Sequence, residues 1–321
     1  ITTTSGSIGI EATTGSIIQG GIINSSSTLN YNSAGAITID AAITAAGDLA
    51  IKTTDGSINQ AGTINTSGNL EYDSSSTITI NETVTTGGTV DINSAGVTTV
   101  TASGDITAEG EVVFGSDKQG SLSIAGDITT SSDNIEFNRK VTLTGDITLD
   151  TGAGAGNMNF ESEIKGDHKL TMSAGSGNID FEKNVGRSGA YLSGISVTSA
   201  AQLKFHKKVK VNSEGIDITA GDVTFNNKVK TRSGGSVEIN NSGLLTLARK
   251  AKMTIGGSFE QTGTGNVSNN TSIKATSGDV SFASDKVETK GMTISTPNQT
   301  QVPQFDPSMR YRYFKVIWWR R

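Results

Sequence analysis

The chain has 321 residues, of which 39 are glycine, 3 are proline and none is cysteine, and its formal net charge is −5. The missing cysteines exclude thiol catalysis, disulfide scaffolds and cysteine-bound zinc, and no apolar run is long enough for a membrane-spanning helix. Serine and threonine make up about a quarter of the chain and hydrophobic residues only 34%, which argues against a helical enzyme. Apolar residues nevertheless recur at fixed positions, so the chain is patterned and not disordered.

From its first residues onward, the chain repeats a pair of apolar residues separated by a single residue. Eleven of the twelve intervals between successive pairs are 20–24 residues long, and the last is 35. A fixed interval of this kind is typical of a repeat architecture. The pairs are Ile8/Ile10, Leu29/Tyr31, Leu49/Ile51, Leu70/Tyr72, Val90/Ile92, Val112/Phe114, Ile135/Phe137, Met158/Phe160, Ile179/Phe181, Leu203/Phe205, Val223/Phe225, Leu245/Leu247 and Val280/Phe282.

Each interval contains two further short alternating runs, such as Ile37/Ile39 and Ile43 after Leu29/Tyr31. Gly, Asn, Asp and Ser, which turn a backbone easily, bound every run. Three short strands and three corners predict one coil of a β-solenoid, in which alternate side chains point inward and each strand pairs in parallel with its counterpart one coil away. We therefore predict an all-β, right-handed parallel β-helix over residues 1–295, with about 13 coils of ~21 residues and three short strands per coil.

The second members of the pairs predict one inward-facing column. Seven of the ten phenylalanines fall on it, and tyrosine or isoleucine precedes them in the earlier coils. An aromatic binding track is the alternative, but each Phe is in phase with the other apolar member of its pair, so we favour a stacked core ladder. The predicted ladder is Phe114, Phe137, Phe160, Phe181, Phe205, Phe225 and Phe282.

Three coils show the repeat most clearly: GNIDFEKNV at 177–185, GDVTFNNKV at 221–229 and GDVSFASDKV at 278–287. With GDITLDTGAG at 145–154, they resemble the repeats of filamentous-haemagglutinin-like exoproteins, which are large secreted bacterial adhesins. The resemblance extends to about residue 296 and implies an extracellular or cell-surface β-helix that holds adhesive surfaces away from the cell. The secretion and membrane-attachment domains of that family are not recognisable, so we expect a mature chain or a segment of a longer protein.

Charge is distributed unevenly along the repeat. Residues 1–110 contain ten acids and one base, whereas residues 200–260 contain ten bases and five acids. The bases follow the Phe column in a motif F-x-x-K-V, which predicts one lysine column of Lys140, Lys208, Lys228 and Lys250 and another, two residues later, of Lys210, Lys230 and Lys252. The plain interpretation is a solvated face. The functional one is a stripe that binds an anionic polymer such as a surface polysaccharide, lipopolysaccharide or extracellular DNA. Specific nucleic-acid recognition is not expected, because the aromatic residues point inward.

The repeat becomes irregular toward its end. The 35-residue interval marks residues 256–278, where either a loop projects from one coil or an additional coil surrounds Phe259 and Val267. All three prolines follow within 296–307, which predicts a linker. Residues 308–321 form an aromatic and basic tail that is unlike the rest of the chain.

The tail allows three interpretations. It caps the last coil, it docks on a neighbouring subunit and so gives end-to-end self-association into a filament, or, as the least favoured case, it anchors at a membrane interface. The residues expected to dock are Tyr311, Tyr313, Phe314, Ile317, Trp318 and Trp319.

No set of residues in the sequence converges on a catalytic centre. The two histidines, His168 and His206, lie at unrelated positions of different coils, and we expect both on the surface. Seven Gly-Asp pairs recur coil after coil, which indicates a role in corners and not a unique site. Their acids are Asp48, Asp105, Asp127, Asp146, Asp167, Asp222 and Asp279. Neither a nucleotide-binding loop nor a calcium-binding nonapeptide is present, so we expect no cofactor and no metal.

We therefore predict a non-catalytic extracellular β-solenoid, a rod module of a bacterial surface adhesin or of a self-assembling surface or matrix filament, as in a biofilm. Repeated weak contacts along it would add up by avidity. The rival class is a polysaccharide-binding or polysaccharide-cleaving β-helix protein, which would need a groove with non-repeating acids and bases. An ice-binding protein is less favoured, because the threonine-rich runs at 77–80 and 98–101 do not align across coils.

Overall fold

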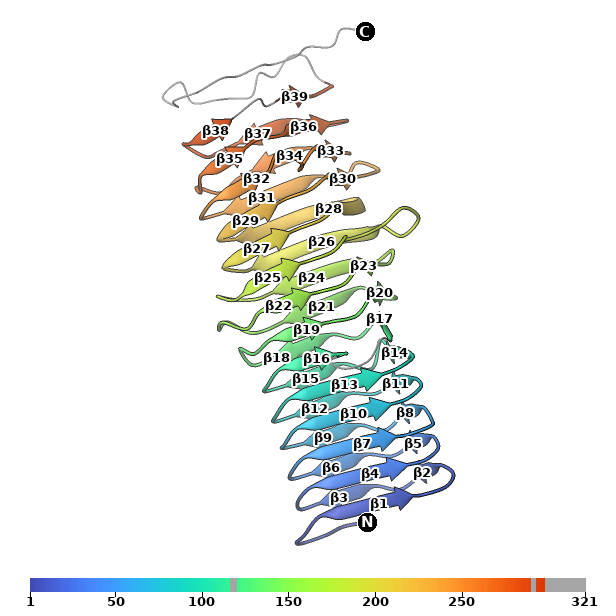
Figure 1. The fold of residues 1–321 in the computed structure, drawn as a ribbon. Coiled ribbons are helices and arrows are strands. Elements are labelled where there is room, and N and C mark those ends of the chain that lie inside the picture. Colours follow the sequence, from blue (N-terminus) through green and yellow to red (C-terminus); the bar gives the residue numbers. More distant parts are fainter. Residues whose placement is uncertain (116–119, 290–292, 298–321) are drawn as a thin grey trace. The chain divides into compact units, whose positions relative to one another are not determined.

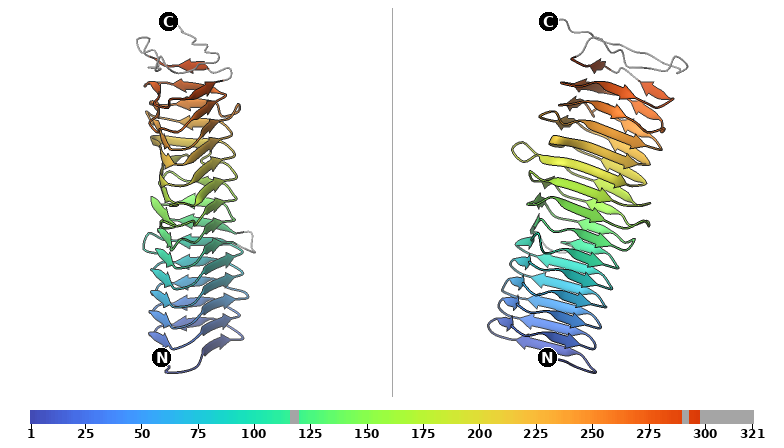
Figure 2. Two further views of the ribbon diagram at one scale, coloured as in Figure 1. Left: turned by 90° about the vertical axis from the view of Figure 1, so that its left-hand side faces the viewer. Right: turned by 180° about the vertical axis from the view of Figure 1, so that it is seen from behind.

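The computed structural model describes residues 1–115, 120–289 and 293–297, and every helix or strand found in them is a β-strand. The strands form about 13 turns of about 21 residues with three strands per turn, which confirms the predicted parallel β-solenoid. The chain divides into two compact units, Ile1–Ser162 and Glu163–Arg321. Within each unit the strands lie in stacked layers joined by short corners (Figures 1 and 2).

In the first unit each turn gives one strand to each of three parallel sheets, called faces A, B and C. Face A contains β1 (Ile8–Ala12), β4 (Leu29–Ser33), β7 (Leu49–Thr53), β10 (Leu70–Ser74), β13 (Val90–Ser94), β16 (Val112–Phe114), β19 (Ile135–Phe137) and β22 (Met158–Phe160). Face B contains β2 (Ile17–Gln19), β5 (Ile37–Ile39), β8 (Ile58–Gln60), β11 (Ile78–Ile80), β14 (Val97–Val100), β17 (Ser121–Ile124) and β20 (Val141–Leu143). Face C contains β3 (Ile23–Ser25), β6 (Ile43–Ala45), β9 (Ile64–Thr66), β12 (Val84–Thr86), β15 (Ile106–Ala108), β18 (Ile128–Thr130) and β21 (Ile147–Asp150).

The second unit repeats this arrangement with longer strands on face C. Face A contains β25 (Asn178–Phe181), β27 (Gln202–Phe205), β29 (Asp222–Phe225), β32 (Leu245–Leu247), β35 (Val267–Asn269) and β38 (Val287–Thr289). Face B contains β23 (Ile164–Lys165), the start of β28 (Val209–Ala220), β30 (Val229–Thr231), β33 (Met253–Ile255), β36 (Ser272–Ala275) and β39 (Thr293–Ser295). Face C contains β24 (Lys169–Ser173), β26 (Leu192–Ser199), the end of β28, β31 (Val237–Asn241), β34 (Phe259–Gln261) and β37 (Val280–Phe282).

Strict alternation of apolar and polar residues explains these short strands. Most have three residues, of which the first and third are buried and the second points outward. Because parallel pairing keeps the register from turn to turn, equivalent side chains stack in columns. On face A the rings of Phe114 and Phe137 stack with centroids 5.4 Å apart, and those of Phe205 and Phe225 are 4.9 Å apart. The core of each unit is therefore a set of ladders that needs few apolar residues per turn.

Phe282 does not lie in the Phe ladder, so its predicted place there is wrong. It belongs to β37 on face C, where it pairs with Gln261, and its ring is tilted by 49° against Phe259 with centroids 5.4 Å apart. On face A the column continues instead through Leu247, Asn269 and Thr289. The pair Val280/Phe282 has the same apolar alternation as the face A pairs but lies on face C. Alternation alone does not show which of the two faces a pair belongs to.

The same observation accounts for the 35-residue interval. Leu245 lies on face A and Val280 on face C, so the interval covers one complete turn and part of the next. Residues 256–278 contain all of β34, β35 and β36, and these strands pair in parallel with the turn before them. This placement corresponds to the additional coil around Phe259 and Val267 and not to a projecting loop. Of the predicted linker, Thr296 and Pro297 are described, whereas the remainder and the tail residues from Tyr311 to Trp319 lie outside the described residues.

Corner aspartates connect successive turns. A carboxylate oxygen of Asp105 accepts the backbone N–H of Asp127 at 2.8 Å, and Asp127 in turn accepts that of Thr148 at 2.7 Å. Asp48 and Asp222 accept the N–H of Asn69 and Leu244 in the same way. These acids satisfy backbone donors that the corner leaves without a sheet partner, which is a structural role.

Candidate anion-binding face

Outward lysines gather on face B of the second unit, and we call this set the basic face. Lys208, Lys228 and Lys252 form one column, because the N–H of Val209 donates to the carbonyl of Lys228 and that of Val229 to the carbonyl of Lys252. Lys210 and Lys230 pair directly in the next column, which continues through Thr254 to Lys274. All of these lysines are exposed or half-exposed.

One lysine of the predicted stripe lies elsewhere. The prediction for Lys250 is wrong, because the corner between Leu247 and Met253 holds two more residues than the corner one turn earlier. Lys252 therefore takes the place next to Lys228, and Lys250 lies within the lengthened corner, where the N–H of Ala251 donates to the carbonyl of Ala248. Lys140 belongs to the first unit, directly before β20, and its place in one column with Lys208 stays a prediction.

The basic face carries an uncompensated positive charge. No lysine of the face forms an ion pair with a described carboxylate, whereas Lys52 pairs with Glu71 at 2.6 Å and Lys286 with Glu288 at 3.0 Å on other surfaces. Turns of a parallel solenoid are about 4.8 Å apart, and two unit charges at that distance repel by about 1 kcal/mol in water. A multivalent anion lying across the turns would remove this repulsion and would do so most strongly at low salt.

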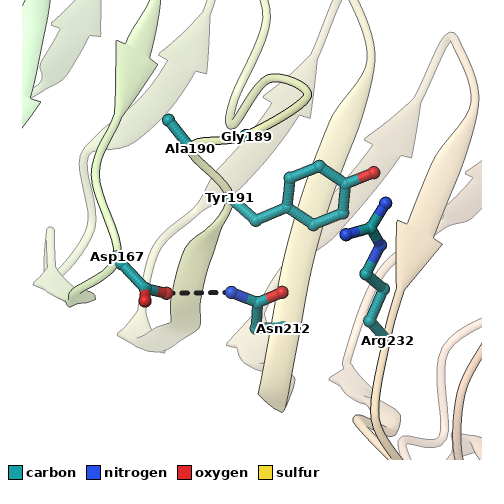
Figure 3. Close-up of a pocket in the computed structure, with 6 residues that line it drawn as sticks. All are labelled: Asp167, Gly189, Ala190, Tyr191, Asn212 and Arg232. Carbon is teal, nitrogen blue, oxygen red and sulfur yellow. Dashed lines mark hydrogen bonds between the residues drawn. The ribbon is translucent and has the colours of Figure 1, made fainter.

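A pocket opens at the edge of the basic face, where face B passes into face C. It has a volume of about 190 Å³ and is lined by Asp167, Gly189, Ala190, Tyr191, Asn212 and Arg232. The Arg232 guanidinium carbon lies 4.2 Å from the centroid of the Tyr191 ring, and Asn212 donates a hydrogen bond of 2.8 Å to Asp167 (Figure 3). Unlike the corner aspartates above, Asp167 is thus bound by a side chain from 45 residues further along the chain.

The described residues also contain one cluster with metal-ligand chemistry, on face A. Nε2 of His206 lies 3.0 Å from a carboxylate oxygen of Asp180 and 3.4 Å from one of Glu182. All three side chains remain partly solvent-exposed, between 24% and 50%. His206 is consequently a surface residue, as expected, but it contacts two acids that the sequence did not connect with it. The three groups lie close enough to form an ion pair whenever the imidazole carries a proton.

Sequence reasoning missed the pocket, although one signal was present. Tyr191 lies in the 24-residue interval between Ile179 and Leu203, the longest of the regular ones. Its additional residues form the loop 186–191, which closes with an antiparallel bridge between Arg187 and Ala190. A coil longer than its neighbours is therefore the place to look for a non-repeating site.

Comparisons with known proteins agree with the fold. The haemagglutinin repeat family model matches residues 3–55 and 44–110, consistent with filamentous-haemagglutinin-like repeats in a β-solenoid. No curated protein and no solved structure matches the chain. No helix long and apolar enough to span a membrane occurs within residues 1–115, 120–289 and 293–297.

Proposed function

We propose that this chain is a non-catalytic, extracellular rod module of a bacterial adhesin or of a surface or matrix filament, and that its basic face binds an acidic polysaccharide. The haemagglutinin repeat match to residues 3–55 and 44–110 in a β-solenoid is the observation that carries the adhesin class. The lysine columns supply the binding chemistry. Equal charges recur on successive turns, so each contact is weak and a polymer that crosses several turns gains affinity by avidity.

A polysaccharide suits these columns better than a folded protein partner. Most strands on face B are short and present a single outward column or two, so the face offers rows of charge without an apolar centre. Protein–protein interfaces generally have such a centre, built from aromatic and aliphatic residues. A flexible polyanion needs only spaced cations, which the face provides.

Binding to immobilised polygalacturonate across a salt series tests the proposal. The purified chain is compared with a triple variant in which Lys208, Lys228 and Lys252 are replaced by glutamine. We expect affinity to fall with rising salt for the unchanged chain, and the slope of log affinity against log salt to fall by about two to three in the variant, close to one per neutralised lysine. The charge-matched control replaces Lys52, Lys183 and Lys286, exposed lysines off the basic face, with glutamine.

Two results would contradict the proposal. Equal losses in the variant and in its charge-matched control would show that net charge, and not the basic face, drives binding. Release of new reducing ends from the polysaccharide by the unchanged chain would favour the rival enzyme class. In that case substitution of His206 by alanine is the first variant to assay, since His206 adjoins two carboxylates.

A further inference from the structure

The Tyr191 pocket differs from the aspartate corners described above, because its residues do not repeat from turn to turn. Its polar lining comes from successive turns, with Asp167 after β23, Tyr191 before β26, Asn212 within β28 and Arg232 after β30. Figure 3 shows these side chains around one opening, with Gly189 and Ala190 in a narrow loop above it. In a repetitive fold, a constellation that occurs once is a stronger indication of a site than one that recurs at every corner.

The backbone around the pocket is held in conformations that ordinary residues avoid. Gly186 and Gly189, both in the loop 186–191, have φ of +69° and +83°, and Ser233, next to Arg232, has φ of +51° despite its side chain. A non-glycine residue in this region costs about 1–3 kcal/mol and persists only where surrounding contacts fix it. Ser233 directly follows Arg232, whose guanidinium lies against the Tyr191 ring.

Two cations meet on one aromatic ring in this pocket. The Tyr191 ring is only 5% exposed, its centroid is 4.2 Å from the Arg232 guanidinium carbon, and it lies 5.5 Å from Nζ of Lys210. Nζ of Lys210 also donates a hydrogen bond of 3.2 Å to the Ser188 hydroxyl. Neither cation forms an ion pair with a described carboxylate. The ring holds the guanidinium plane in place, which leaves the N–H fork ready for a planar anion.

The opposite side of the pocket offers groups for hydroxyls. Asn212 donates to one oxygen of Asp167, and the second carboxylate oxygen accepts no hydrogen bond from a described residue. A carboxylate next to an amide is a usual combination for hydroxyl-rich ligands, because one accepts and the other both donates and accepts. The volume of about 190 Å³ is smaller than the ~300–1,000 Å³ of sites for drug-sized ligands and suits a single sugar ring.

We propose that this pocket binds one carboxylated sugar unit, a uronate residue of the acidic polysaccharide. Arg232 holds the sugar carboxylate through two parallel N–H···O bonds, Lys210 adds charge, and Asp167 with Asn212 binds ring hydroxyls. This inference rests on the proposed function and assigns the ligand class: the lysine columns attract any polyanion, and the pocket selects a carboxylate on a sugar ring.

Calorimetry with digalacturonate tests the pocket apart from the columns, because a ligand of two units covers only about two turns at ~4.8 Å per turn. The matched ligand is the same oligosaccharide with its carboxylates methyl-esterified, which keeps the rings and removes the charge. We expect the methyl ester to bind the unchanged chain at least about tenfold more weakly than the acid form does. The Arg232→Lys variant is expected to lose the same factor in affinity for the acid form, because lysine keeps the charge but lacks the planar pair of N–H donors. Arg249→Lys is the control, since it makes the same change at an exposed arginine that does not line the pocket, and it is expected to change affinity less than twofold.

Each outcome decides between the two proposals. Equal binding of acid and ester, or unchanged affinity in Arg232→Lys, overturns the pocket inference while leaving the lysine columns as a general polyanion surface. Tight binding of the oligosaccharide together with an unaffected Lys208/Lys228/Lys252 variant overturns the role of the basic face and keeps the pocket. Folding of each variant is checked by circular dichroism, and Arg232 is solvent-exposed, so its replacement leaves the core untouched.

Discussion

Truncation of Phe205 tests whether the aromatic ladder behaves as a stack of local contacts. Phe205 is 1% exposed and lies between Phe181 and Phe225, with ring centroids 4.9 Å away on both sides and interplanar angles of 6° and 10°. Phe205→Ala leaves a cavity the size of the phenyl ring, and the stacked rings of Phe181 and Phe225 are held by their own turns and do not fill it. The matched variant is Phe282→Ala, which makes the same chemical change at a 6% exposed side chain whose aromatic neighbour, Phe259, is tilted by 49°.

The magnitude follows from burial and stacking. Replacing a buried Phe by Ala costs about 3–5 kcal/mol through lost transfer energy and the cavity left behind. Each aromatic pair adds about 0.5–1.5 kcal/mol beyond its buried area. Phe205→Ala removes two such pairs, so we expect it to lower the free energy of unfolding by about 4–5 kcal/mol, at the upper end of this range. Phe282→Ala removes one less favourable pair, so we expect a loss of about 3–4 kcal/mol.

Native-state hydrogen exchange followed by mass spectrometry measures this cost turn by turn. Because each turn of a solenoid contacts only its neighbours, Phe205→Ala is expected to lower amide protection in β25, β27 and β29 by about three orders of magnitude. Strands β4 to β10 of the first unit are expected to keep their protection. An equal loss in the first unit, or the same loss for Phe282→Ala as for Phe205→Ala, would refute the picture of nearest-neighbour ladders.

Two further predictions concern the first unit. Burial and two neighbouring glutamates raise the pKa of Glu136 above its ordinary value of 4.5, so its ionised form disfavours folding at neutral pH, and Glu136→Gln is expected to raise the stability at pH 7 by about 0.2–1 kcal/mol. That gain in stability should disappear below about pH 4.5, where the glutamate is protonated in both the folded and the unfolded state. Thermal melts at pH 7 and below about pH 4.5 check this. Glu71→Gln is the control and is expected to give no gain, because Glu71 is ion-paired with Lys52. At Gly62, a Cβ would lie 2.3 Å from the backbone oxygen of Ala41, whereas at Gly9 it meets nothing within 4 Å, so Gly62→Ala should lower the melting temperature by several degrees and Gly9→Ala should not.

Much of the fold could be predicted because the same pattern of apolar residues and corner residues recurs in nearly every turn of the solenoid. The alternating pairs identify face A in most turns, and the Phe residues from Phe114 to Phe225 stack where that alternation places them. Hydrophobic period 2 and corner residues suffice for this, since both are local properties of the chain.

One of the two errors arose where a corner changed its length. The interval from Phe225 to Leu247 is 22 residues on face A, but that from Val229 to Met253 is 24 on face B, and only the three-dimensional register shows that the two added residues fall between them. Lys250 was misplaced for this reason, whereas Phe282 was misplaced because its pair on face C alternates as a face A pair does, while face A itself continues through Asn269 and Thr289. Contacts between turns, such as His206 with Asp180 or Arg232 with Tyr191, depend on the same register and leave no pattern along the chain.

The division of labour between the lysine columns and the pocket follows from the repeat itself. A column that recurs on each turn presents the same charge at a spacing of about 4.8 Å, so a polymer can shift along it by one turn with little change in binding energy. The column by itself therefore confers affinity without selectivity. Selectivity needs an arrangement that occurs once, and a solenoid can build it only where one coil departs from the period. The loop 186–191 is such a departure, and it places Tyr191 beneath Arg232 at the edge of the basic face. A polymer held by the columns would thus be fixed in register wherever a carboxylated ring enters the pocket.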